Sequence, residues 1–191
     1  DYNDLEKITN EQCNHICNSI LHELIHARNF FSLQNEEREK IINNKMTLAH
    51  YGWKVLDEYS AYKEANQVYP ETADELNGNV DDVFKAFEHM GKGILIKESD
   101  WNLYDAFYNY CSALIVRYIL DKQNLLKENT ENYKRGVKKY MEDLEYSYNK
   151  MPLTYKQYES LGRRLVSDLL ILVPEKSKKV FKYNTHIRDL N

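Results

Sequence analysis

The chain has 191 residues, a length typical of one domain with its own hydrophobic core. Hydrophobic residues make up 42% and charged residues 29%, which excludes a disordered chain. The net charge is −4 with acidic and basic residues interleaved, so we expect no nucleic-acid partner. No apolar run approaches the ~18 residues of a membrane span, so we expect no membrane partner.

Few residues interrupt the periodic segments, since the chain contains six glycines and three prolines. This composition predicts a mostly α-helical single domain over residues 1–191. Within it we expect a metal-site core over 10–69, a helical C-terminal part over 71–172 and a basic tail over 173–191. Three cysteines without framework spacing favour a reducing compartment, the cytoplasm, although the chain opens on Asp1 rather than Met, which leaves a removed N-terminal segment and secretion open.

The first predicted helix starts at a capping box formed by Thr9 and Gln12 and runs to about Phe31. At 100° per residue, its apolar side chains fall in one stripe, which predicts the face that packs on the core. The stripe consists of Cys13, Ile16, Cys17, Ile20, Leu24, Ala27 and Phe31. Cys13 and Cys17 are one turn apart, a spacing that suits a metal, but their place in the stripe favours buried free thiols.

The opposite side of this helix carries histidines where a solvated helix would carry Lys and Glu. His15, His22, His26 and Asn29 fall together there, which predicts that this side faces a cleft. His15 is interpreted as a polar edge residue or an alternative metal ligand.

The sequence His22-Glu23-Leu24-Ile25-His26 fits the pattern H-E-x-x-H. Two histidines four residues apart on a helix present their nitrogens to one ion, and the glutamate between them projects beside it as a general base. The plainer interpretation is a pair of hydrogen-bonded core histidines beside a surface glutamate. Burial of two imidazoles without partners is costly, and this cost favours the metal.

Two helices are predicted next: a short one over 36–43, capped by Asn35, and one over 47–69 that stops at Pro70. The second helix offers Asp57, Glu58 and Glu64 as a third metal ligand.

The helical wheel separates these carboxylates. Glu58 shares a stripe with Ala61 and Ala65, whose small side chains let another helix approach closely, whereas Asp57 and Glu64 lie on a more polar side with Trp53 and Ser60. Glu58 is therefore preferred over Glu64; otherwise Glu58 is a solvated residue paired with Lys54 or Lys63.

The remaining elements are predicted from caps and breakers. They are a turn at Thr72–Glu75, a helix from Asn79 to Gly91, a strand over 93–98, a helix from Ser99 to Leu126, a helix from Asn132 to Asn149 that ends before Pro152, and a helix to Leu172 that starts at the capping box of Thr154 and Gln157.

H-E-x-x-H followed by a helix with the sequence Glu58-Tyr59-Ser60-Ala61-Tyr62 resembles the gluzincin class of zinc metallopeptidases, and the compact layout is similar to that of the ImmA/IrrE type. The resemblance covers about residues 15 to 69. It implies a zinc ion held by His22, His26 and Glu58, with Glu23 as general base for hydrolysis of a peptide or protein substrate. Members of the class usually carry a β-sheet before the first zinc helix. Only about eight residues precede it here, so we expect a helical zincin-like domain with little or no sheet in this chain.

Such a peptidase also needs a donor for the oxyanion. Our candidates are Tyr51, Tyr62 and His50, and further aromatic or histidine residues could serve instead. The latter are Tyr59, His89, Tyr104 and Tyr108.

Two alternative functions stay open. One is a zinc-binding, non-catalytic sensor or protein-interaction domain, in which Asp57, Glu64 or His15 closes the fourth coordination position. The other is a metal-free helical interaction module, with the tyrosine-rich helix over 99–126 as its partner surface.

Overall fold

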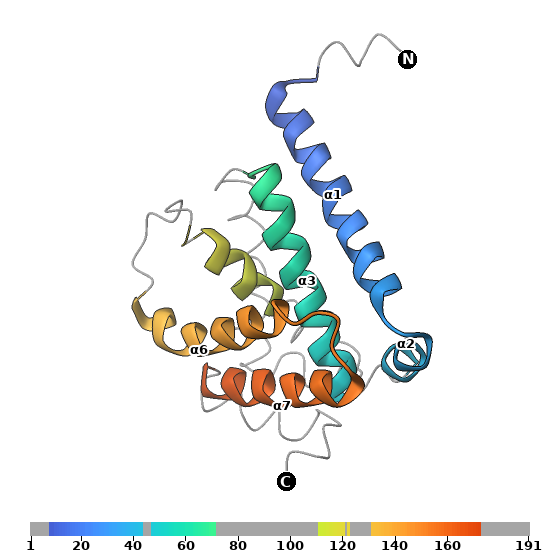
Figure 1. Cartoon of the computed structure of the whole chain (residues 1–191). Helices are drawn as coiled ribbons and strands as arrows, with labels where there is room; N and C mark the ends of the chain where they lie inside the picture. The colour runs from blue at the N-terminus through green and yellow to red at the C-terminus, as the bar shows by residue number, and fades with distance from the viewer. Residues whose placement is uncertain (1–7, 44–46, 72–110, 121, 123–130, 173–191) are drawn as a thin grey trace, which may run out of the picture.

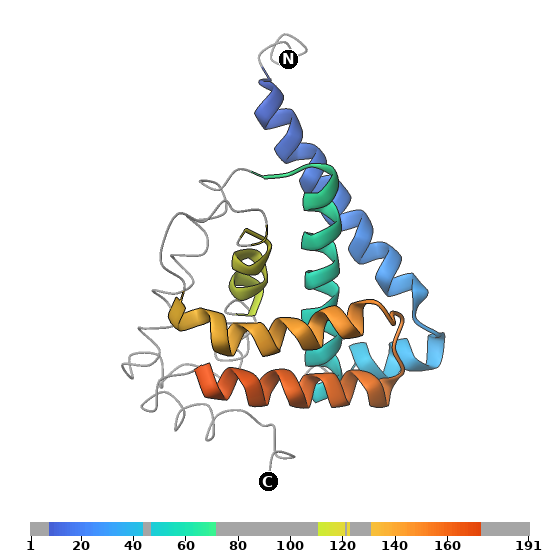
Figure 2. The ribbon, with the colours of Figure 1, turned by 60° about the vertical axis from the view of Figure 1, so that its left-hand side comes forward.

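The computed structural model describes residues 8–43, 47–71, 111–120, 122 and 131–172, and within these ranges the chain is helical and contains no strand. A mostly α fold is thereby confirmed. The helices are α1 (Asn10–Ser32), α2 (Asn35–Ile42), α3 (Leu48–Val68), α6 (Glu131–Tyr148) and α7 (Tyr155–Leu172), together with a helical segment over 111–120. Figures 1 and 2 show α6 and α7 side by side, with α3 crossing them and α1 running along α3.

The ends of α1 are both satisfied by side chains. At its start, Thr9 and Gln12 form the predicted capping box, with the Thr9 side chain accepting from the Gln12 N–H and the Gln12 side chain accepting from the Thr9 N–H. At its end, the Arg38 guanidinium of α2 donates to the carbonyls of Phe30, Phe31 and Leu33. These bonds satisfy carbonyl groups at the end of α1 and tie α2 to that end.

The other caps agree closely with the sequence. The Thr47 side chain caps α3 by accepting from the His50 N–H, and Thr154 with Gln157 caps α7. The cap of α2 differs, because Asn35 is already helical and Gln34 is the N-cap, without a side-chain cap bond. The first residue of α2 is therefore Asn35, one residue earlier than predicted.

α3 and α7 cross at two glycines that lie against each other. A Cβ atom at Gly52 would overlap with the backbone carbonyl of Tyr158, and one at Gly162 would overlap with that of Leu48. Because neither position has room for a side chain, the backbones of α3 and α7 come into direct contact.

The main core lies where α3, α6, α7 and the segment over 111–120 meet. Its fully buried side chains include Tyr59, Leu114, Tyr140, Leu144, Tyr158 and Leu165. In the described part of the predicted tyrosine-rich helix, Cys111 and Ile115 are completely buried, and so is Leu114.

The predicted core face of α1 is wrong. Ile16, Ile20, Leu24 and Phe31 are 46%, 55%, 59% and 71% exposed, Cys13 is exposed and Cys17 half-buried. The opposite, polar side of α1 packs on α3 instead. The interpretation of Cys13 and Cys17 as buried free thiols is corrected with it.

The physical reason is that the α1–α3 contact is made mainly of hydrogen bonds. Its apolar part is small, namely Ile25, Ala61 and Ala65 with Leu21 at the edge. Beside it, the buried Asn18 amide donates to the Asn66 side chain and to a backbone carbonyl. Buried polar groups that find partners cost little, so a polar face can be the inner one.

The predictions for Thr72–Glu75, for the helix to Gly91 and for the strand over 93–98 fall outside the described residues, as do those for Ser99 to Tyr110 and for the tail over 173–191. Among the described residues, no helix has the length and apolar character needed to cross a membrane.

Candidate metal centre

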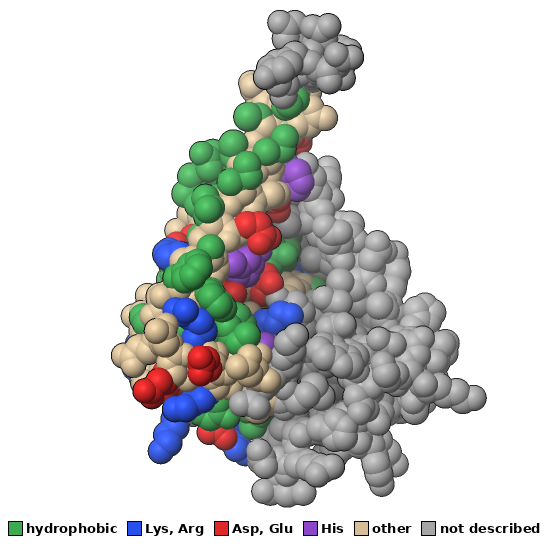
Figure 3. All heavy atoms as spheres, turned by 90° about the vertical axis from the view of Figure 1, so that its right-hand side faces the viewer, with side chains coloured by type: hydrophobic (Ala, Val, Ile, Leu, Met, Phe, Trp, Pro, Cys, Tyr) green, Lys and Arg blue, Asp and Glu red, His purple; other side chains and the backbone are tan. Residues whose placement is uncertain are grey.

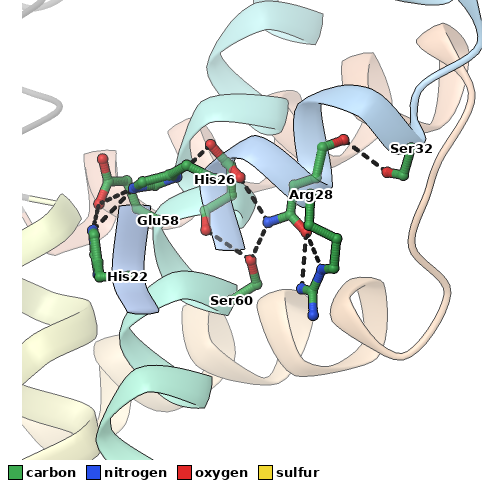
Figure 4. Close-up of polar contacts among 8 residues, drawn as sticks. His22, His26, Arg28, Ser32, Glu58 and Ser60 are labelled. Carbon is green, nitrogen blue, oxygen red and sulfur yellow. Dashed lines mark hydrogen bonds and ion pairs between the residues drawn. The ribbon is translucent and has the colours of Figure 1, made fainter. Parts of the chain in front are cut away.

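Three predicted ligands meet between α1 and α3 (Figure 4). The His22 and His26 Nε2 atoms are 2.9 Å apart, and Glu58 Oε2 lies 3.5 Å from the first and 3.7 Å from the second. All three side chains are partly buried, with exposed fractions of 15%, 21% and 19%. Among the described residues they form the one group of three His, Cys, Asp or Glu side chains spaced to hold a metal ion.

The size of this triangle suits zinc. Zinc binds histidine nitrogen and carboxylate oxygen at about 2.0–2.2 Å in tetrahedral geometry, which puts neighbouring ligand atoms roughly 3.3 Å apart. Of the three distances between ligand atoms, 2.9 Å is shorter than that value, and 3.5 and 3.7 Å are longer. Two nitrogens and one oxygen are also the ligand types that zinc prefers, and a set of three leaves the fourth position for water or substrate.

The outer nitrogen of His26 is held by Asp57. His26 Nδ1 lies 2.7 Å from Asp57 Oδ2. A carboxylate can only accept, so Nδ1 carries the proton and His26 Nε2 keeps its lone pair for an ion. The 2.9 Å contact to the other histidine is then a hydrogen bond from His22 Nε2–H. Binding of a cation would displace that proton.

Asp57 is itself fixed by α1. It is 6% exposed, and its Oδ1 accepts from the Asn29 amide at 2.7 Å. The same amide donates to Ser60 Oγ, and the Ser60 hydroxyl donates to the Asp57 backbone carbonyl (Figure 4). This closed network fixes the orientation of the His26 ring, and carboxylates commonly hold the outer nitrogen of a histidine in this way at zinc sites.

The electrostatics of the site favour positive charge. Burial lowers the pKa of His26, but the hydrogen bond and charge of Asp57, followed by the charges of Glu58 and Glu23, outweigh burial and raise that pKa above its ordinary value. The same negative groups that stabilise a proton on His26 would stabilise a metal cation in its place.

Glu23 lies on α1 next to the ligand pair. It is exposed, and its charge is felt at His26. On the helix it stands 100° around from His22 and 60° from His26, beside the cluster but not among the three candidate ligands.

Of the three candidate oxyanion donors, Tyr62 lies at the cluster. Its ring packs edge-on against the His22 ring, with centroids 4.7 Å apart. Burial, followed by the charges of Glu58 and Glu71, raises the pKa of Tyr62 to about 12, so the phenol keeps its proton at neutral pH.

His50 and Tyr51 are buried in the core. His50 Nδ1 contacts the Ile41 carbonyl, and the Tyr51 hydroxyl contacts Cys111 Sγ. They precede Glu58 by eight and seven residues, about 12 and 10 Å along α3. The structure therefore does not bring them to the cluster.

The other residues considered as ligands have different partners. Glu64 accepts a bidentate pair of hydrogen bonds from Arg28 and a third from Tyr148, and the half-exposed His15 contacts Glu71 at 3.0 Å. Tyr59 donates to Glu145. The remaining candidates, His89, Tyr104 and Tyr108, fall outside the described residues.

Sequence reasoning missed the role of Asp57 and Asn29. The signal was present as polar side chains on both helices, Asn18 and Asn29 in line with the histidines on α1, and Asp57 and Ser60 three residues apart on α3. The helical wheel placed the α3 pair on the more polar side of the helix, and the structure buries both residues, with Asn29 of α1 donating to each.

Comparison with protein-family models, with curated proteins and with solved structures found no match for this chain.

Proposed function

We propose that the chain binds one zinc ion through His22, His26 and Glu58 and hydrolyses peptide bonds with Glu23 as general base. The observation that carries this proposal is the ligand triangle, with its 2.9, 3.5 and 3.7 Å sides. It is supported by Asp57, which aims the His26 lone pair inward, and by the partial exposure of all three ligands, which leaves a way in for a substrate.

Zinc bound there would supply Lewis acidity and lower the pKa of a water molecule toward neutrality. The Glu23 carboxylate would accept a proton from the attacking water and later donate it to the leaving amine. For this role Glu23 has to be accessible and outside the ligand set, as it is on α1.

Tyr62 is the candidate for stabilising the negative charge that develops on the substrate's carbonyl oxygen. A tyrosine hydroxyl is protonated at neutral pH and can donate, burial raises the pKa of this one further to about 12, and its ring packs against His22. A donor held in place at a partly buried site is what oxyanion stabilisation requires.

The test separates the chemistry from metal binding. Zinc-loaded chain would be incubated with a mixed peptide library and with unfolded casein, and cleavage followed by mass spectrometry. Glu23→Gln should retain zinc and lose at least ~100-fold in cleavage rate. Glu11→Gln, at an exposed position in the first turn of the same helix, should cleave like the wild type. Equal rates for Glu23→Gln and wild type would remove Glu23 from the mechanism.

A second candidate function is favoured by one observation. α1 is attached to α3 through a small apolar cluster and a set of polar contacts, so zinc shared by the two helices would act as a clamp. A chain that binds zinc with the proposed ligands and cleaves none of the peptides would support this non-catalytic role.

A further inference from the structure

The exposed side of α1 carries a continuous row of apolar side chains. Figure 3 shows hydrophobic residues running along the helix on the face turned away from α3. We call this row the outer stripe; it consists of Cys13, Cys17, Ile20, Leu24, Ala27 and Phe31. With Ile16 beside it, four large apolar side chains are between 46% and 71% exposed. Large contiguous apolar patches on a protein surface commonly mark an interface.

The spacing of the outer stripe indicates what kind of surface it fits. Its members follow one another at intervals of four, three, four, three and four residues. That is the 3.5-residue repeat of a coiled-coil seam, sustained over about 27 Å of helix. A seam with this repeat is complementary to a second helix with the same repeat, because its side chains then pack as knobs into the holes between those of the partner.

We propose that the outer stripe is a dimer seam, in which α1 of one copy packs in parallel against α1 of a second copy of this chain. The second copy is favoured because it supplies both the matching repeat and the matching charges. The seam itself requires no bound zinc.

The flanking charges select the parallel orientation. Glu23 and Arg28 border the outer stripe on opposite sides and are five residues apart. In a parallel pair of helices this offset places Glu23 of one copy beside Arg28 of the other, twice per dimer. In an antiparallel pair that aligns Ile20 with Leu24, the two Glu23 side chains would face each other and repel. Arg28 donates to Glu64 and to the Asn29 side chain yet remains 54% exposed, so its positive charge can still attract a carboxylate of the second copy.

The interface is short, so we expect a dimer that dissociates on dilution. The full-length chain would be examined by size-exclusion chromatography with light scattering over a range of micromolar concentrations. The mass should approach twice 22.8 kDa at the high end. Leu24→Glu should keep the mass near that of the monomer at every concentration, with an unchanged circular dichroism spectrum.

Val68→Glu is the matched control. Val68 lies on α3 and is 58% exposed, nearly the same as Leu24 at 59%, but it is not part of the outer stripe. This variant should dimerise like the wild type. A wild type that stays monomeric, or a dimer that survives Leu24→Glu, would overturn the proposal. So would a monomer that binds phospholipid vesicles through Leu24, because the stripe would then face a membrane.

The orientation is tested with a single thiol in the seam. In Cys13→Ser, a parallel dimer places the two Cys17 side chains opposite each other, and diamide should join them as a disulfide by taking up the two electrons and two protons of the thiols. Cys13→Ser/Cys17→Ser should give no covalent dimer, since the remaining Cys111 is buried. An antiparallel seam would pair Cys17 with Ala27 and keep the two thiols about 15 Å apart. A dimer that forms no disulfide in Cys13→Ser would therefore contradict the parallel arrangement.

Discussion

Asp57 is the residue on which the geometry of the candidate metal centre depends most. It accepts hydrogen bonds from His26 Nδ1–H and from the Asn29 amide, so it fixes both the tautomer and the orientation of a candidate ligand. Replacement by Asn would remove its negative charge while nearly preserving its shape.

We therefore expect Asp57→Asn to weaken zinc binding by about 10–100-fold, the usual effect of losing the carboxylate that holds the outer nitrogen of a ligand histidine. Isothermal titration calorimetry with zinc on the metal-free protein would measure it. Asp143→Asn, which alters a carboxylate paired with Arg164 away from the site, is the control and should bind like the wild type. Equal affinities for Asp57→Asn and wild type would mean that Asp57 does not support the ligand.

Glu64 gives a second prediction at the residue scale, this time for stability. The hydrogen bond with Arg28, followed by the one with Tyr148, lowers the pKa of Glu64 against the effect of its burial. A carboxyl group whose pKa is lower in the folded state stabilises the fold above its unfolded pKa of ~4.3, and this contribution is lost as the pH falls through the folded value.

Glu64→Gln should accordingly lower the free energy of unfolding at pH 7 by roughly 1 kcal/mol at most, because Arg28 is half exposed and water screens the pair. The difference from wild type should shrink as the pH is lowered below the unfolded pKa. Urea denaturation at several pH values measures this. Glu159→Gln, in a more exposed pair with Arg163, should have almost no effect at any pH. A Glu64→Gln deficit that grows on acidification would refute the linkage.

The meeting of His22, His26 and Glu58 could be predicted from sequence because H-E-x-x-H places the two histidines on one side of a helix, and a carboxylate beside small residues indicates a close helix contact. Asp57 could not, since its role depends on how α3 is rotated against α1. That rotation is set by contacts between residues distant in sequence, such as Asn29 with Asp57.

At the scale of the elements, helix limits followed closely from caps and breakers, whereas the inward face of α1 did not follow from periodicity. The periodicity argument assumes that the apolar stripe is buried. In α1 the inner face consists of residues such as Asn18, His26 and Asn29, which are satisfied by partners on α3, while Leu24 and Phe31 point outward. Whether the polar side chains of one helix find partners depends on the residues of the other helix, so the buried face cannot be predicted from the sequence of α1 alone.

The glycine contact between α3 and α7 yields a prediction at this scale. Gly52→Ala would press a methyl group into the Tyr158 carbonyl and force the two helices apart. We expect a loss of roughly 3 kcal/mol or more in the free energy of unfolding, because the obstacle is backbone and cannot rotate away. Lys156→Ala, at an exposed position of α7, is the control. Chemical denaturation compares them, and a Gly52→Ala variant as stable as the control would show that the crossing is looser than described.

At the scale of the whole molecule, the described part consists of a well-packed core and one helix attached to its side. The core of α3, α6 and α7 buries large side chains, whereas α1 is held by Ile25, a few alanines and polar contacts. A metal shared by His22, His26 and Glu58 would join the two parts.

Removal of zinc with a chelator should therefore increase amide hydrogen exchange in α1 selectively, while α7 stays protected. Hydrogen-exchange mass spectrometry of the zinc-bound and metal-free forms would measure this. His22→Ala should show the same fast exchange in α1 with or without added zinc. Unchanged hydrogen exchange in α1 after complete metal removal would show that its polar contacts with α3 hold the helix in place without zinc.

The most direct test of the central claim is the zinc content of the purified full-length chain, measured by inductively coupled plasma mass spectrometry after incubation with zinc and removal of the excess. The ligand triangle predicts about one zinc per chain in the wild type and in Glu64→Gln, and little or none in His22→Ala and Glu58→Gln. A wild type without zinc would contradict the proposed metal centre, and a Glu58→Gln variant with full zinc content would remove Glu58 from it.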